Sequence, residues 1–331
     1  MRRARLVSLS FVLLISACSR GRSTAPISEP STPDQSTLQA PASGGATSAS
    51  APEEKTSEIP YTKDRRLSYG GYLIMIERRL VNVEGFVADV ERAVLKKKGR
   101  IIAVFDRVRD PHGASIALAL APVVGDRHRQ LVVEQTGPRQ WAYWVVALKP
   151  RFRVIFNSAD YGVGHELEAN DVDGDGTSEL FMTLHTFWFF DGLCGACSPN
   201  FAIAFKYDQR RGVFRPANHT VKGLCYTADE LIQAEQKIRV WQGDNPDFIS
   251  TPIKTSELYS KVLIYALPMI YCGREDLGWS FFDRLYNLPD RAVRKSRIKR
   301  TLRRDRVYRA IQNDLERTRR EASLHRARVS G

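Results

Sequence analysis

The chain contains the stretch Asp171-Val172-Asp173-Gly174-Asp175-Gly176-Thr177-Ser178-Glu179-Leu180. The first, third and fifth positions are carboxylates that converge on one point in a tight loop, and the glycine at the sixth position permits the sharp turn. Such hard oxygen ligands suit Ca²⁺. Position twelve is Met182 rather than Glu, which excludes an EF-hand, and a strand over 179–186 is expected to begin at once. The loop therefore leads into a β unit.

A weak internal repeat surrounds this loop. Gly125-Asp126 followed by Leu131-Val132-Val133 has the spacing of Gly174-Asp175 followed by Leu180-Phe181-Met182, an offset of 49 residues. We expect each copy to hold four antiparallel strands, over 115–157 and 165–216, each unit being the size of a propeller blade. Two blades cannot close a propeller, so the units are expected to pack as a sandwich or curved sheet covered by helices. In each copy one strand is expected before the Gly-Asp turn and two after the strand that follows it. These strands are 116–121, 141–148 and 152–156 in the first copy, and 166–169, 201–207 and 212–214 in the second.

The acidic loop and the strand after it resemble the calcium loops of FG-GAP and VCBS repeats, as in integrin-type propeller blades. The resemblance covers one repeat. In that family, loop positions one, three, five and nine ligate Ca²⁺ and position seven supplies a carbonyl. The first copy carries Pro122, Val124 and Gln130 at three of the aligned positions, so its site is lost. The resemblance implies as ligands Asp171, Asp173, Asp175, the Thr177 carbonyl and Glu179.

We expect this Ca²⁺ to be structural. Carboxylates crowded in one turn repel one another unless a cation neutralises them, so the ion would clamp the loop against its strand. The alternative is an Asp/Gly-rich turn that needs no ion. A catalytic metal is disfavoured because no histidine pair has suitable spacing, and His165 and His185, which flank the loop, are given no role.

Helices are expected on both sides of the β region. Val87, Val90 and Val94 suggest one helical face within 59–98, and the lysines before Gly99 suggest its end. A strand over 101–108 follows. Further helices are expected over 228–241, over 256–271 with Pro268 interrupting it, and as one long charged helix from Asp290. Because strands and helices lie in separate runs, the fold class is α+β.

The N-terminus reads as an export signal over 1–17, with three arginines, an apolar run and then small residues. The ending Ile15-Ser16-Ala17-Cys18 resembles the lipobox of bacterial lipoproteins, in which the cysteine is acylated and becomes the first mature residue. An ordinary secretory signal is the alternative. Ser19, rather than Asp, after the cysteine favours the outer over the inner membrane. Residues 18–58 then form a Ser/Thr/Ala/Pro-rich disordered linker between the acylated cysteine and a globular domain over 59–286.

Four cysteines remain after Cys18. Outside the cytoplasm an even number suggests two disulfides, with three possible pairings. Two alternatives are a redox-active pair in Cys194-Gly195-Ala196-Cys197 and a Zn²⁺ site made by all four sulfurs. The candidates are Cys194, Cys197, Cys225 and Cys272.

The net charge of +13 is concentrated at the chain ends. Residues 290–331 hold 15 Arg or Lys against five acids, a net +10, within an expected basic helical tail over 287–331. This tail could bind an anionic membrane face, lipopolysaccharide phosphates, peptidoglycan carboxylates or a protein partner, or it could dock on the globule. Nucleic acid fits the charge but not the compartment.

With 43% hydrophobic residues and one short apolar run at the N-terminus, the chain is neither disordered throughout nor a multi-span transporter. Our first hypothesis is a non-catalytic, membrane-anchored lipoprotein of the bacterial cell envelope with a binding or structural role. The alternative is an extracytoplasmic enzyme acting on cell-wall or polysaccharide material, with acids from the loop or Glu166. A third is an assembly factor whose tail docks on a partner.

The aromatic run over 187–190 is expected to be core, with an exposed recognition patch as the minor alternative.

Overall fold

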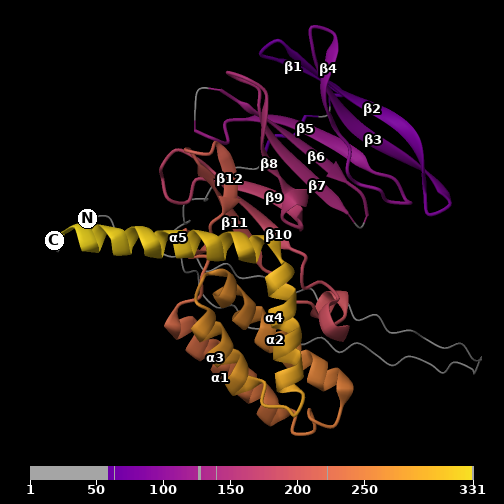
Figure 1. Cartoon of the computed structure of the whole chain (residues 1–331). Helices are drawn as coiled ribbons and strands as arrows, with labels where there is room; N and C mark the ends of the chain where they lie inside the picture. The colour runs from indigo at the N-terminus through magenta and orange to yellow at the C-terminus, as the bar shows by residue number, and fades with distance from the viewer. Residues whose placement is uncertain (1–58, 63, 126–127, 139, 222, 330–331) are drawn as a thin grey trace, which may run out of the picture. The chain divides into compact units, whose positions relative to one another are not determined.

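The computed structural model describes residues 59–62, 64–125, 128–138, 140–221 and 223–329, all within one compact unit (Figure 1). The expected signal sequence, Cys18 and the linker lie outside the described residues, as does Asp126 of the repeat. Three four-stranded antiparallel sheets and five α-helices make up the described part, which confirms the α+β class.

The first sheet has the order β1-β2-β3-β4 and contradicts the expected helix over 59–98. Its strands β2 and β3 pair along twelve residues each, and Val87 is 72% exposed while Val90 and Val94 are buried. The valine spacing was therefore not a helical face. The strands are β1 (Arg66–Tyr69), β2 (Tyr72–Val83), β3 (Phe86–Lys97) and β4 (Arg100–Phe105).

Two-residue turns explain why this segment forms hairpins. Gly70-Gly71, Glu84-Gly85 and Lys98-Gly99 each join consecutive strands, and all six residues have positive φ. A turn with positive φ at both central positions matches the twist of the flanking strands. The lysines before Gly99 thus lead into a hairpin turn and do not end a helix.

The other two sheets contain the strands expected from the repeat. Their orders are β5-β6-β7-β8 and β12-β11-β10-β9, so each sheet is a simple antiparallel meander along the chain. The strands of the first are β5 (Ser115–Ala121), β6 (Gln130–Thr136), β7 (Trp141–Ala147) and β8 (Arg153–Asn157). Those of the second are β9 (Val163–Asn170), β10 (Glu179–Leu184), β11 (Ala202–Asp208) and β12 (Val213–Pro216).

The sheet β5–β8 is buried on both faces. Leu131 and Val133 of β6 pack in a cluster with Ile74 and Val90 of the first sheet. Val132, between them on the strand, belongs to a second cluster that includes β9–β12 and the helices. Successive side chains of a strand point to opposite faces, so a continuous apolar run can serve two cores at once.

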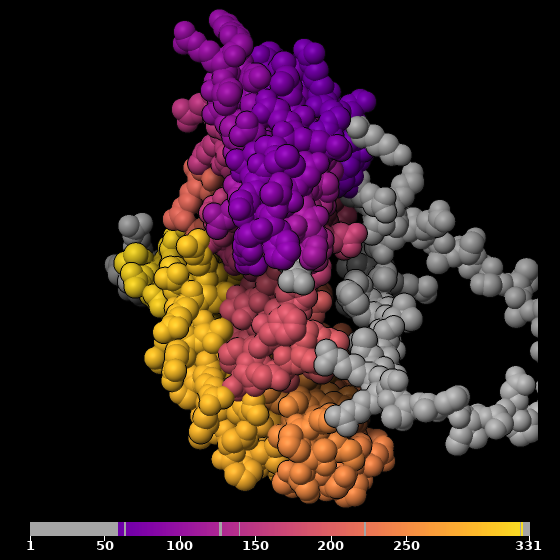
Figure 2. Space-filling model, turned by 90° about the vertical axis from the view of Figure 1, so that its right-hand side faces the viewer, coloured from indigo at the N-terminus to yellow at the C-terminus, as the bar shows by residue number. Residues whose placement is uncertain are grey.

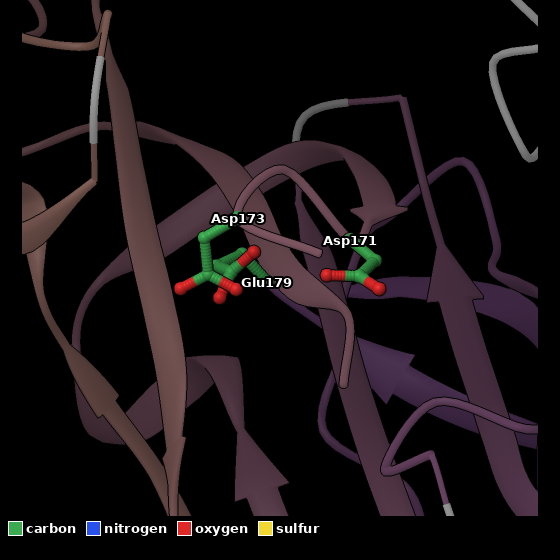
Figure 3. A group of neighbouring side chains, drawn as sticks. All are labelled: Asp171, Asp173 and Glu179. Atoms are coloured by element: carbon green, nitrogen blue, oxygen red, sulfur yellow. The ribbon is translucent and has the colours of Figure 1, made fainter. Parts of the chain in front are cut away.

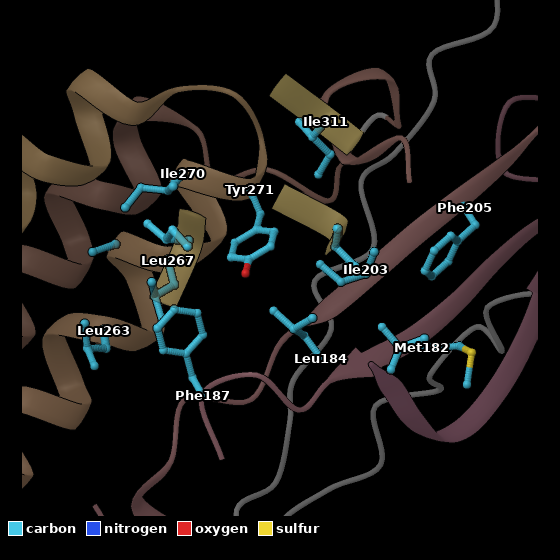
Figure 4. Packing of buried hydrophobic residues seen from close by; sticks show 14 of the residues in the cluster. Met182, Leu184, Phe187, Ile203, Phe205, Leu263, Leu267, Ile270, Tyr271 and Ile311 are labelled. Atoms are coloured by element: carbon cyan, nitrogen blue, oxygen red, sulfur yellow. The ribbon is translucent and has the colours of Figure 1, made fainter. Parts of the chain in front are cut away.

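Helices cover the far side of this second cluster. In Figure 4, Leu184 and Ile203 from the strands face Leu267 and Tyr271 from a helix, with Ile311 closing one side. No helix among the described residues is both long and apolar enough to span a membrane. The helices are α1 (Ala228–Asp244), α2 (Pro252–Tyr271), α3 (Glu275–Leu285), α4 (Arg291–Arg304) and α5 (Arg306–Val329), and Pro268 lies inside α2 without ending it.

The basic tail is two helices, not one. Asp305 is extended between α4 and α5, and its Oδ1 accepts a hydrogen bond from the Tyr308 amide at 2.7 Å, as a helix N-cap does. Its Oδ2 accepts a hydrogen bond from the Thr186 hydroxyl, which ties the corner to the loop after β10. A buried carboxylate with these two partners explains the break in the expected single helix.

Candidate functional site

The acidic loop joins β9 to β10, as expected. The Asp171 carboxylate accepts hydrogen bonds from the amides of Gly174 at 2.9 Å, Asp175 at 3.1 Å and Gly176 at 2.9 Å. Gly174 and Gly176 have φ of 74° and 83°, values that suit glycine. Both oxygens of Asp171 therefore shape the loop.

Three of the predicted ligands lie together. One carboxylate oxygen from each of Asp171, Asp173 and Glu179 lies within 4.8 Å of the others, close enough to ligate one ion (Figure 3). Asp175 accepts a hydrogen bond from the Thr177 amide at 2.8 Å and is outside this group, and Thr177 is buried. The structure thus brings together three of the five predicted residues as candidate ligands.

Glu179 is the only buried carboxylate among the candidate ligands. Its side chain is 1% exposed, and its Oε2 accepts a hydrogen bond from the Val172 amide at 3.1 Å. Its Oε1 accepts no hydrogen bond from the described residues. Burial raises the pKa of this carboxyl, because the charged form loses water. Apart from the Lys206 ammonium at 3.5 Å, this oxygen therefore lacks the hydrogen-bond donor that a buried carboxylate needs.

Lys206 of β11 is a member of the site that the sequence did not indicate. Its ammonium forms an ion pair with Asp173 and lies 3.0 Å from Asp175 Oδ2 and 3.5 Å from Glu179 Oε1. Hydrogen bonding to Lys206 lowers the pKa of Asp175, and the carboxylates raise the pKa of Lys206. One ammonium faces three carboxylates, so it compensates only part of their charge.

The turn of the first copy lies against the acidic loop. A Cβ on Gly125 would lie 1.9 Å from the Gly176 carbonyl oxygen, and the Ser178 amide donates to the Val123 carbonyl at 3.0 Å. In place of Glu179 the first copy has Gln130, whose Oε1 accepts from the Val124 amide at 3.0 Å. Gln130 and Glu179 thus each accept a hydrogen bond from an amide of the turn that precedes them.

The four cysteines form two pairs at disulfide distance, Cys194 with Cys197 and Cys225 with Cys272. This selects one of the three pairings left open by the sequence. The first pair lies in the loop between β10 and β11, and the second links the segment before α1 to the end of α2. The zinc alternative would require both pairs to be reduced.

Aromatic and histidine rings stack next to the cysteine loop. Trp141 stacks on His165 with ring centroids 4.2 Å apart, and His185 stacks on Trp188 at 4.8 Å. Burial lowers the pKa of His185 to about 4, and the charge of the neighbouring His165 is a smaller contribution in the same direction. Both histidines thus join an aromatic cluster, and neither belongs to the acidic group at the loop.

The aromatic run over 187–190 is divided between core and surface. Phe187 is fully buried, whereas Trp188 and Phe189 are 38% and 66% exposed. The core prediction therefore holds for Phe187 and is wrong for Trp188 and Phe189, which lie at the surface.

Two carboxylates outside the loop bear on the enzyme hypothesis. Glu134 of β6 accepts a hydrogen bond from the Tyr143 hydroxyl at 3.3 Å, and burial raises its pKa. The charge of Glu166, which is exposed, raises it further. Two surface hollows of about 440 and 430 Å³ adjoin the first sheet, and neither is lined by Glu134 or Glu166.

The basic tail docks for half of its length. Ile298, Leu302, Val307 and Ile311 are buried against the globule, so α4 and the start of α5 are part of the core. From Glu316 to Leu324, every residue of α5 is exposed. Figure 1 shows the C-terminal part of α5 projecting beyond the sheets and the other helices.

The chain matches no protein-family model, no curated protein and no solved structure.

Proposed function

We propose that the protein is a non-catalytic lipoprotein of the bacterial cell envelope, anchored in the outer membrane through Cys18, whose helical arm binds an anionic envelope component. We define the arm as residues 316–329 of α5. The observation that carries the proposal is the exposure of residues 316–324 of this arm, since a docked helix would bury an apolar face.

The composition of the arm supports an anionic ligand. It contains five arginines and two glutamates. Arg317 pairs with Asp314, and Arg320 lies 3.5 Å from Glu316. Exposed pairs of this kind are weak, so the arginines can exchange them for phosphates or carboxylates of a ligand.

We propose further that Ca²⁺ clamps the acidic loop. The donor set fits a hard divalent cation, since Asp171, Asp173 and Glu179 offer oxygens within reach of one ion. The Oε1 of the buried Glu179 is an independent indication, because it accepts no hydrogen bond and the Lys206 ammonium lies 3.5 Å away, beyond an ordinary hydrogen-bond distance. Lys206 would then be a competitor of the ion.

The blade-like character of the two meanders is part of the same proposal. Gln130 and Glu179, 49 residues apart, both bind an amide of the turn that precedes them. The two bonds differ by one residue in the position of the donor, and their similarity supports a duplicated unit of which only the second copy kept its acidic ligands.

The anchor is tested by growing cells with radioactive palmitate. We expect label on the wild-type protein in the outer-membrane fraction, and none on Cys18→Ala. Label-free wild type among soluble cytosolic proteins would disprove the anchor and the compartment.

Binding by the arm is tested by sedimentation of the full chain and of a chain ending at Leu315 with three ligands: vesicles containing anionic phospholipid, lipopolysaccharide and peptidoglycan. We expect the full chain to bind at least one of them at low salt and the shortened chain to bind about ten-fold more weakly, with an unchanged melting temperature. Equal binding by both chains would refute the role of the arm.

The calcium clamp is tested by thermal melting with a chelator and with about 1 mM Ca²⁺, which is well above the Kd of many protein sites. A higher melting temperature in Ca²⁺ supports the clamp. Equal melting under both conditions would refute it.

The enzyme hypothesis rests on Glu134 and Glu166. Burial raises the pKa of Glu134, as in a general acid of glycoside hydrolysis, and Glu166 is a nearby carboxylate whose charge adds to this shift. Release of reducing sugars from cell-wall glycan by the wild type, but not by Glu134→Gln, would favour this function over binding.

A further inference from the structure

We propose that Cys194–Cys197 is an exchangeable disulfide that oxidises a dithiol of a partner polypeptide. This goes beyond the binding function and does not depend on it. The pair lies in the loop between β10 and β11. In Figure 2 the pink segment, whose colour the bar gives to residues near 190, lies between the sheets above and the helices below.

Cys194 is the accessible sulfur of the pair. It is exposed, whereas Cys197 is half-buried. Thiol–disulfide exchange begins with attack of an incoming thiolate on an accessible sulfur. A partner thiolate therefore reaches Cys194 Sγ first.

A hydrogen bond to Cys194 favours the reduced state. The Cys197 amide donates to Cys194 Sγ at 3.1 Å, at the start of the short 3-10 helix η3 (Gly195–Cys197). Such a bond is stronger when the acceptor carries a charge, so it stabilises a Cys194 thiolate more than a disulfide sulfur. Stabilising the reduced form makes a disulfide a better oxidant.

The loop is held in place without the disulfide. The Ser198 hydroxyl donates to the Cys194 carbonyl at 2.9 Å and accepts from the Phe189 amide at 2.8 Å. The Ser260 hydroxyl of α2 donates to the Cys197 carbonyl.

The other pair differs, since Cys225–Cys272 closes a sequence separation of 47 and Cys272 is buried at the end of α2. Reduction of Cys194–Cys197 should therefore leave the fold intact.

Exposed aromatic rings next to the pair provide a surface for a polypeptide. A Cβ on Gly195 would lie 3.0 Å from the Phe189 ring and 3.7 Å from Trp188 Nε1, so both rings lie over the Cys-Gly-Ala-Cys turn. Phe189 has φ of 53°, and Asp191, also at 53°, is held by Arg294 and Arg297. A bulky exposed residue such as Phe189 at positive φ is strained, and such conformations cluster at functional sites.

The exchange balances in two steps. A partner thiolate attacks Cys194 Sγ, the bond to Cys197 breaks, and Cys197 leaves as a thiolate that takes up a proton. The second thiolate of the partner then attacks the partner's own sulfur in the mixed disulfide. This forms the partner's disulfide and releases Cys194 as a thiolate, which is protonated in turn. The partner dithiol thus loses two electrons and two protons, and the cysteine pair gains them.

The first test titrates the full-length protein with dithiothreitol, followed by alkylation and peptide mass analysis. We expect Cys194 and Cys197 to be alkylated at a dithiothreitol concentration at least about ten-fold below that needed for Cys225 and Cys272, with unchanged near-UV circular dichroism. Reduction of both pairs together, or reduction only with loss of the fold, would overturn the proposal.

The second test separates the two sulfurs. Cys197→Ser leaves Cys194 free, and Cys194→Ser leaves Cys197 free. We expect Cys197→Ser to form a mixed disulfide with oxidised glutathione about ten-fold faster than Cys194→Ser at pH 7. Equal rates, or faster reaction of Cys194→Ser, would overturn the assignment of Cys194 as the attacked sulfur.

The third test measures the transfer itself with a reduced synthetic peptide that contains two cysteines. The wild type should yield one oxidised peptide per protein, and Cys194→Ser/Cys197→Ser, which keeps the other disulfide, should yield none. Equal oxidation by this double variant would show that the pair is not the oxidant.

Discussion

The ammonium of Lys206 lies 3.5 Å from Oε1 of Glu179, the buried carboxylate oxygen that accepts no hydrogen bond from the described residues. The lysine also bridges Asp173 and Asp175 across the mouth of the loop. An internal cation thus occupies the region where Ca²⁺ would bind. If the loop binds Ca²⁺ as we propose, its affinity for the ion is therefore set by how readily the ion replaces Lys206.

Lys206→Met should make the fold more dependent on calcium. Without the ammonium, four carboxylates repel one another, so the melting temperature in chelator should fall. Ca²⁺ at about 100 times its Kd then adds about 2.7 kcal/mol to the free energy of unfolding, or about 5–10 °C in a domain of this size. Calorimetry of both proteins with and without Ca²⁺ measures the difference.

Lys254→Met is the matched control, because Lys254 is as exposed as Lys206. It pairs with Asp247, and both residues are far from the acidic loop in the sequence. It should change neither the melting temperature in chelator nor the effect of Ca²⁺. If Lys206→Met shows no larger Ca²⁺ effect than this control, Lys206 does not compete with an ion.

Gly125→Ala should destabilise the contact between the two turns. Its Cβ would lie 1.9 Å from the Gly176 carbonyl, which is backbone and cannot move aside alone. Gly162→Ala is the control, since its φ of 67° is close to the 65° of Gly125 but nothing lies within 4 Å of the new Cβ. We expect Gly162→Ala to lower the free energy of unfolding by about 1 kcal/mol and Gly125→Ala by about 3 kcal/mol or more in denaturant unfolding. Equal losses would show that the turns do not touch.

The strands of the second and third sheets could be predicted because their apolar runs and glycine turns are local signals. The same is true of the acidic loop, whose spacing brings Asp171 and Asp173 together whatever the rest of the chain does. The first sheet contradicts the expectation because the spacing of Val87, Val90 and Val94 fits a helix as well as a strand. The distinguishing signals are the hairpin turns Glu84-Gly85 and Lys98-Gly99.

Long-range partners could not be predicted from one sequence. Lys206 reaches the loop because Phe205 pairs with Leu180, and strand register is not visible in the composition of either strand. Likewise, Asp305 breaks the basic helix by bonding Thr186, a residue 119 positions away.

His185 should make the fold sensitive to mild acid. Burial lowers its folded pKa from 6.5 to about 4, so the unfolded chain binds a proton at a higher pH than the folded one. The stabilisation is complete above pH 6.5 and is lost as the pH falls toward 4. Allowing for partial exposure, the loss is about 1–2 kcal/mol. His185→Gln should reduce this slope in urea titrations between pH 4 and 7, whereas His112→Gln, at an exposed position, should not. An unchanged slope in His185→Gln would contradict the assignment.

Asp305 should have the opposite effect. Burial raises its folded pKa above the ordinary 3.8, so the folded state holds the proton to a higher pH than the unfolded chain does. Its titration therefore lowers stability as the pH rises from 3.8 through the folded pKa, and Asp305→Asn should remove that decrease while keeping a side-chain oxygen for the Tyr308 amide. Asp305→Ala removes the cap as well and leaves the Thr186 hydroxyl without its acceptor, which costs about 2–3 kcal/mol at neutral pH. Urea unfolding of the three proteins from pH 3 to 8 distinguishes the two roles. If Asp305→Asn keeps the wild-type pH profile, the buried carboxyl is not the titrating group. If Asp305→Ala is as stable as Asp305→Asn, the N-cap does not stabilise the corner between α4 and α5.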